Sequence, residues 1–150
     1  MRIMISSSMY FAKEILANKK KLESLGHDVS IPVDTEWHLE PNVNTDNHEE
    51  DYNHCVENDV IRRCLDLIRQ SDALFVNNYP KQTWYGEGIY GLLDGYIGPS
   101  VFAEMFFAHY FRKAIYLLFP PPPISAMRSS HEVMIMQPRI LNGDLTKIGK

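Results

Sequence analysis

A single acidic residue, Glu104, lies within an otherwise apolar stretch that runs from Pro99 to Phe111. A carboxylate in such surroundings loses its hydration, which costs several kcal/mol unless hydrogen bonds or a raised pKa offset the loss. Three interpretations are open: a structural acid that caps a loop or pairs with Arg or Lys, a chance acid at an edge, or a working carboxylate at the base of a pocket. A working carboxylate of this kind could act as a nucleophile or as an acid–base group.

Three consecutive serines are the first polar candidates to surround such a site. Ser6, Ser7 and Ser8 follow the short apolar segment 2–5, which predicts a strand that ends in a small polar loop. In an open α/β sheet, ligands bind outside the carboxyl ends of the strands, where such a loop lies. The chain has neither a glycine-rich dinucleotide fingerprint nor a P-loop lysine motif, so a small polar ligand group fits better. The equal alternative is that the serines cap the following helix.

Two further segments carry polar or aromatic candidates. Asn78 follows the apolar run 73–76, which predicts a central parallel strand whose end faces the same site. The segment 81–95 is rich in glycine and aromatic residues. It is either a surface connection or a flap that covers a ring-shaped ligand.

Histidines and acids between residues 34 and 54 raise the question of a metal site. His38, His48 and His54 lie among several Glu and Asp residues, but no pair has the compact spacing of a zinc motif. We therefore expect a solvated irregular segment over 34–52, mobile or acting as a lid, and no metal or other cofactor.

The elements that must position these residues alternate between strand and helix. Gly98 and Pro99 predict the start of a helix that ends near Phe111, apolar almost all round and hence buried. Such alternation predicts right-handed crossovers and an α/β, flavodoxin-like or Rossmann-like three-layer sandwich with a five-stranded parallel sheet. The remaining predicted strands are 27–33, 114–119 and 138–144, and the remaining helices are 9–25, 55–70 and 125–136.

Composition and charge bound the class of protein. The chain has 150 residues, of which 45% are hydrophobic, and this predicts one domain over residues 1–150. Its net charge of -4, with no basic stripe, argues against a nucleic acid polymer as partner. No apolar stretch reaches membrane-spanning length, and the amino terminus is too short for a signal peptide. Cys55 and Cys64 are expected to be free thiols, so we predict a cytoplasmic protein without a membrane partner.

Three segments together resemble a known family. They are Ser71–Asn77, Tyr96–Ala108 and Lys113–Leu118, which contain an acid before an apolar strand, a glutamate on a helix, and a lysine before a second apolar strand. In this order they resemble the nucleoside 2-deoxyribosyltransferase-like family, whose superfamily includes 2'-deoxynucleoside 5'-phosphate N-hydrolases. The resemblance covers most of the chain and implies the flavodoxin-like fold.

The resemblance also implies roles for particular residues. In that family the glutamate on this helix is the nucleophile that attacks the anomeric carbon of a deoxyribosyl group, a role that falls to Glu104. Family members that exchange bases carry an aspartate six residues earlier, where this chain has Gly98. A second family acid falls on Asp59 only if an insertion is allowed. Relatives complete their sites with residues of a neighbouring subunit, which implies a homodimer or a higher homo-oligomer.

The resemblance and the residues together favour cleavage or transfer of the N-glycosidic bond of a small molecule, a 2'-deoxynucleoside or its 5'-monophosphate. Glu104 would be the nucleophile and Asp59 the second catalytic acid. The substrate would be held by Ser6, Ser7, Ser8, Asn78, Tyr96, Gly98 and Ser100. One alternative is a non-catalytic nucleotide-sensing module that keeps the fold and has lost the proton-transfer acids. Another is an N-glycosidase that acts on ribosyl compounds.

Overall fold

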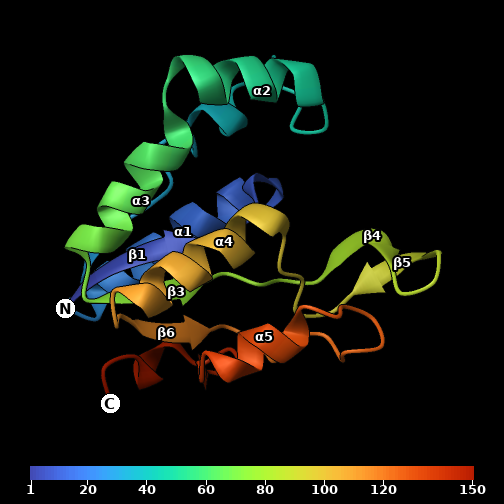
Figure 1. Ribbon diagram of the computed structural model, residues 1–150. Helices are drawn as coiled ribbons and strands as arrows, with labels where there is room; N and C mark the ends of the chain where they lie inside the picture. Colours follow the sequence, from blue (N-terminus) through green and yellow to red (C-terminus); the bar gives the residue numbers. More distant parts are fainter.

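Five short parallel strands form the central sheet of the computed structural model, which describes residues 1–150 (Figure 1). Their order across the sheet is β2-β1-β3-β6-β7, the flavodoxin-like order, so the predicted fold is confirmed. The strands are β1 (Arg2–Ser6), β2 (Asp28–Ser30), β3 (Ala73–Val76), β6 (Ala114–Leu117) and β7 (Arg139–Ile140).

Helices cover both faces of this sheet, as Figure 1 shows. One face carries η1 (Met9–Phe11), α1 (Ala12–Ser24) and the carboxyl-terminal η3 (Leu145–Lys147). The other carries α3 (Val60–Gln70), α4 (Pro99–Tyr110) and α5 (Ser130–Ile135). The sheet is therefore the middle of three layers.

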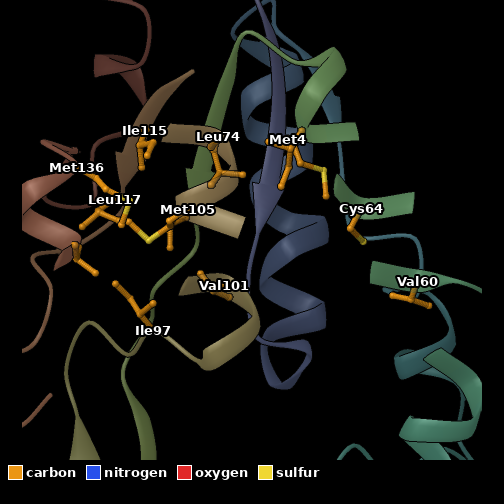
Figure 2. Packing of buried hydrophobic residues seen from close by; sticks show 14 residues of the cluster. Met4, Val60, Cys64, Leu74, Ile97, Val101, Met105, Ile115, Leu117 and Met136 are labelled. Carbon is orange, nitrogen blue, oxygen red and sulfur yellow. The ribbon is translucent and has the colours of Figure 1, made fainter. Parts of the chain in front are cut away.

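The strands are apolar because both of their faces are buried. Met4, Leu74 and Leu117 point to the side of α3, α4 and α5, where Met105 and Val101 of α4 meet them (Figure 2). The residues that alternate with these along the same strands, such as Ile3 and Phe75, point to the side of α1. Two hydrophobic clusters thus pack on the two faces of the sheet and fix the positions of its strand ends.

The predicted single helix over 55–70 is wrong, because two helices occupy this region. α2 (His48–Glu57) ends before Asn58, and α3 begins after Asp59, which has left-handed backbone dihedral angles with φ at 48°. The Asn58 side-chain amide donates to the His54 carbonyl at 2.9 Å and so caps the end of α2. Asn and Asp tolerate the left-handed region better than most residues, which explains the break at this place.

The glycine- and aromatic-rich segment 81–95, predicted to be a surface connection or a flap, contains a β-hairpin. β4 (Lys81–Tyr85) and β5 (Ile89–Leu93) pair antiparallel and stand away from the main sheet (Figure 1). Gly86 and Gly88 both have positive φ, which allows the tight turn between the strands. The Gly86 N–H donates to the Ala126 carbonyl at 3.0 Å and anchors the turn to the segment before α5.

α4 forms as predicted, with Pro99 at its first position after Gly98. The prediction that this helix is buried on all sides is wrong. Val101, Met105 and Ala108 pack on the sheet, whereas Phe106 and Tyr110 keep 46% and 79% of their surface exposed. The reason is that only one face of a helix in an outer layer meets the sheet, and the opposite face is left to solvent. α5 is shorter than the predicted 125–136, with six residues.

Two other sequence-based points can be compared with the structure. Cys55 and Cys64 are free thiols, as predicted. None of the helices has the length and apolar character that crossing a membrane would require.

Candidate active site

Glu104 and Ser6 meet at the carboxyl edge of the sheet, although 98 positions separate them in the chain. Ser6 is the last residue of β1, is buried, and pairs in register with Val76 at the end of β3. Its hydroxyl donates a hydrogen bond to Oε2 of Glu104 on α4. The second oxygen of the carboxylate, Oε1, has no hydrogen-bond partner. The structure therefore brings together two of the residues predicted for the site.

The electrostatic surroundings make Glu104 a weaker acid than an ordinary glutamate. Burial raises the pKa of Glu104 to about 7, the Ser6 hydrogen bond opposes this rise, and the charge of Asp34 adds to it. The carboxyl group thus changes its protonation state near neutral pH. The side chain as a whole is only partly buried.

Asp34 is a residue of this site that the sequence did not single out. It follows the second strand, is buried, and lies close enough to raise the pKa of Glu104. Its place after the carboxyl end of a strand was the available signal, hidden among the many acids of the segment that it begins. Cys64 of α3 also faces this region, and burial raises the pKa of its thiol to about 12, with smaller contributions from Glu104 and Asp34. This cysteine stays a thiol at neutral pH and is a poor nucleophile.

Ser7 and Ser8 do not contact Glu104. The Ser8 hydroxyl oxygen accepts from the Tyr10 N–H at 3.3 Å and caps η1, which was the alternative interpretation of the serines. The Ser7 hydroxyl lies within donating distance of the Ser8 and Asn77 carbonyls, at 3.1 and 3.3 Å. Only the first of the three serines thus reaches the carboxylate.

Asn78 is buried and holds two loops together. Its Nδ2 group donates to the carbonyls of Gly95 at 3.3 Å and Phe119 at 2.9 Å, and its Oδ1 accepts from the Phe119 N–H at 3.0 Å. Because both amide hydrogens are used, this side chain braces the segment that leads to α4 and has no donor left for a substrate.

Tyr96 fills the space beside Gly98. A Cβ atom added to Gly98 would lie 3.2 Å from the Tyr96 hydroxyl oxygen, so the phenol stands where a side chain at position 98 would begin. Burial raises the pKa of Tyr96, which keeps the phenol protonated. The Lys81 ammonium lies 4.9 Å from the Tyr96 ring centroid and 5.1 Å from that of Tyr10. Ser100, in the first turn of α4, is exposed.

Asp59 lies apart from this constellation. It is exposed at the start of α3, and its Oδ2 pairs with Nε of Arg62 at 3.0 Å. It makes no hydrogen bond to Glu104 and does not influence the pKa of that residue. The structure thus does not bring Asp59 to the site, because the turn at 58–59 directs it to solvent.

The prediction of a solvated irregular segment over 34–52 is wrong at both ends, because its first residues are buried and residues 48–52 form the start of α2. Asp34, Thr35 and His38 are all buried, and η2 (Trp37–Leu39) folds back against α2. The Trp37 ring stacks on the ring of His54 with their centroids 3.7 Å apart. Aromatic stacking and buried polar contacts, which leave no periodic signal in the sequence, order this part of the chain.

Comparison with known proteins finds similar solved structures of low sequence identity. No protein-family model matches the chain, and no curated protein matches it significantly. One similar solved structure is the 2-deoxyribosyltransferase from the psychrotolerant bacterium Bacillus psychrosaccharolyticus, 19% identical, with a TM-score of 0.49, covering 83% of this chain and 76% of that chain. Another is the Clostridium botulinum CMP N-glycosidase BcmB, 16% identical, with a TM-score of 0.46, covering 93% of this chain and 85% of that chain. At these identities and TM-scores neither likeness bears on the activity of this chain.

Proposed function

We propose that this chain cleaves or transfers the N-glycosidic bond of a 2'-deoxynucleoside or its 5'-monophosphate, with Glu104 as nucleophile. The observation that carries the proposal is the Glu104–Ser6 pair at the carboxyl ends of β1 and β3. These two strands flank the point where the strand order reverses, which is where ligands bind in open α/β sheets. The reactive carboxylate and the expected ligand site therefore coincide.

The geometry supports a covalent mechanism in two steps. Oε1 of Glu104 attacks the anomeric carbon while the bond from that carbon to the base nitrogen breaks, and the bonding electron pair leaves with the base. Ser6 holds Oε2 through its hydrogen bond and so fixes the direction of Oε1. Water or a second base then attacks the anomeric carbon, the ester bond to Glu104 breaks and releases the carboxylate, and the proton that the attacking group loses neutralises the departed base. Water as acceptor gives hydrolysis, and a second base gives transfer.

Tyr96 is the proposed contact for the leaving base. Its phenol occupies the position beside Gly98 where base-exchanging members of the resembled family carry an acid, and its raised pKa keeps it able to donate a hydrogen bond. Lys81, beside the Tyr96 ring, supplies a positive charge that suits a 5'-phosphate. The phosphorylated substrate is therefore favoured over the free nucleoside.

We further propose a homodimer or larger homo-oligomer in the cytoplasm. Phe106 and Tyr110 form an exposed apolar strip on α4, which a second copy would remove from water. The free thiols of Cys55 and Cys64 agree with a reducing compartment.

The test is release of free base from deoxynucleosides, deoxynucleoside monophosphates and ribonucleotides, followed by chromatography. We expect release by the wild type, its loss in Glu104→Gln, and wild-type release in Asp59→Asn, whose carboxylate faces solvent. Glu104→Gln keeps an acceptor for the Ser6 hydroxyl, so a folded and inactive variant isolates the role of the charge. Unchanged release by Glu104→Gln would contradict the proposal.

A non-catalytic nucleotide-sensing module is the second candidate. It is favoured by the absence of a carboxylic acid beside the proposed leaving group, because position 98 is glycine and Asp59 is bound to Arg62. Nucleotide binding without release of base from any compound of the panel would favour this candidate over the enzyme.

A further inference from the structure

Asp34, which lies beside Glu104, also belongs to a cluster of three ionisable side chains that converge on one point. His38 Nε2 lies 3.3 Å from Asp34 Oδ2 and 3.3 Å from Asp51 Oδ1. One possible ligand atom from each of the three residues lies within 4.8 Å of the other two. Asp34 and His38 come from the segment around η2, and Asp51 comes from α2. The cluster therefore joins the same two elements as the stack of Trp37 on His54.

The imidazole of His38 is an unsatisfied group within this cluster. Its side chain is 1% exposed, and Nε2 has no hydrogen-bond partner, because neither carboxylate contact has hydrogen-bond geometry. A buried polar atom without a partner is rare in folded proteins and calls for an explanation, such as an ion.

The other ring nitrogen has a partner that is compatible with a metal-binding form of the imidazole. Nδ1 of His38 lies 3.4 Å from the Thr45 hydroxyl oxygen. If Nδ1–H donates to Thr45, the lone pair on Nε2 is directed toward the two aspartate oxygens, and three electron-rich atoms face one another. A cation bound between the three atoms would offset their mutual repulsion. A second hydrogen bond of this kind is also what orients histidines that bind metals.

The distances fit a small divalent ion. Zinc bonds to histidine nitrogen and carboxylate oxygen are about 2.0–2.2 Å long, and tetrahedral angles then place the ligand atoms about 3.4 Å apart. The two 3.3 Å separations agree with this value. Magnesium and calcium prefer oxygen ligands alone, so the imidazole favours a transition metal. The Asp51 side chain is 38% exposed, which leaves room for ion entry and for a water ligand.

We propose that Asp34, His38 and Asp51 bind one divalent transition-metal ion of the zinc type, which ties η2 to α2. The ion would lie next to the Glu104 site, because Asp34 belongs to both, but the proposal does not depend on the proposed glycosidic chemistry. Its contribution is to hold the 34–51 segment in its folded position beside the active site.

The experiment is calorimetric titration of the full chain, freed of metal by a chelator, with zinc chloride. We expect one ion per chain for the wild type. His38→Gln and Asp51→Asn each remove one ligand and should weaken binding at least 100-fold. The matched control is His48→Gln, which removes an exposed imidazole from the same region and should bind zinc as the wild type does. Asp51→Asn alters a partly exposed side chain, so it serves if His38→Gln does not fold, as judged by circular dichroism.

The inference is overturned if the wild type shows no saturable binding, or if His38→Gln and Asp51→Asn bind zinc as tightly as the wild type. An equal loss in His48→Gln would also overturn it, because the ion would then be held by surface histidines. Failure here leaves the base-release assay untouched, since that assay reports on Glu104.

Discussion

Replacing Glu104 with glutamine should stabilise the protein above neutral pH, and the gain can be worked out from the site. Glu104 has a pKa of about 7 in the folded chain against 4.5 for an ordinary glutamate. The folded state therefore binds more protons than the unfolded state between these values, and unfolding becomes easier as pH rises through this window. The stability present below pH 4.5 is lost as pH passes about 7. The full loss is about 3 kcal/mol.

The assay is chemical denaturation of the wild type and Glu104→Gln at matched pH values from 5 to 8.5. Glutamine stays neutral, so the advantage of the variant should grow from about 1 kcal/mol at pH 5 to about 3 kcal/mol above pH 8. Subtraction of the two proteins cancels the titration of all other groups. Glu57→Gln is the control, because Glu57 is exposed at the end of α2, and its difference should stay within about 0.5 kcal/mol of zero at every pH.

A difference between the wild type and Glu104→Gln that does not change with pH would refute the reasoning. It would mean that the carboxylate is as well solvated in the folded chain as in the unfolded one. A variant that becomes less stable with rising pH would refute it more strongly, since the sign of the pKa change would then be opposite.

Three further predictions concern the same region. The kcat/KM for base release should rise with pH through about 7, because Glu104 must lose its proton to attack; a pH–rate profile from 5.5 to 8.5 checks this. Ser6→Ala should move the midpoint of that profile to higher pH and lower its plateau, since the lost hydrogen bond favours the charged carboxylate; an unmoved midpoint would count against Ser6 as a partner. Asn78→Ala should lower the free energy of unfolding by about 3 kcal/mol, because it removes three hydrogen bonds of about 1 kcal/mol each. The kcat of the folded variant should stay within a few-fold of wild type, and denaturation and turnover measured on the same protein check both expectations.

The sequence predicts the layers of this fold well, because buried parallel strands and sheet-facing helices leave strong apolar patterns. Met4, Leu74 and Leu117 belong to runs that allow few other structures. The Pro99 helix is equally clear from its starting signal. Breaks and hairpins are harder to predict. The turn at Asp59 depends on one left-handed residue within a continuous helical pattern, and the hairpin around Gly88 has no clear alternation of polar and apolar residues.

The candidate site is predictable only in part, for a different reason. Glu104 and Ser6 stand out because each breaks or ends an apolar element, and the topology then brings them together. Asp34 has no such signal among the neighbouring acids, and its importance comes from burial, which depends on long-range packing. Asn78 follows the end of β3, as predicted, but it braces two loops and leaves no amide hydrogen for a substrate. Its partners, the carbonyls of Gly95 and Phe119, lie on distant backbone segments that no local pattern reveals.

Helix α2 is held to the rest of the molecule without a buried side chain of its own. This helix buries none of its residues, and Tyr52 and Val56 on it are mostly exposed. In Figure 1 it stands beyond α3, away from the sheet. Its amide hydrogens should therefore exchange with solvent by a local opening that costs far less than global unfolding, while those of β1 and β3 exchange only when the whole sheet opens. The chain thus divides into a slowly exchanging sheet layer and the helix α2, which opens easily. Asp51, one of the two carboxylates beside His38, lies on α2.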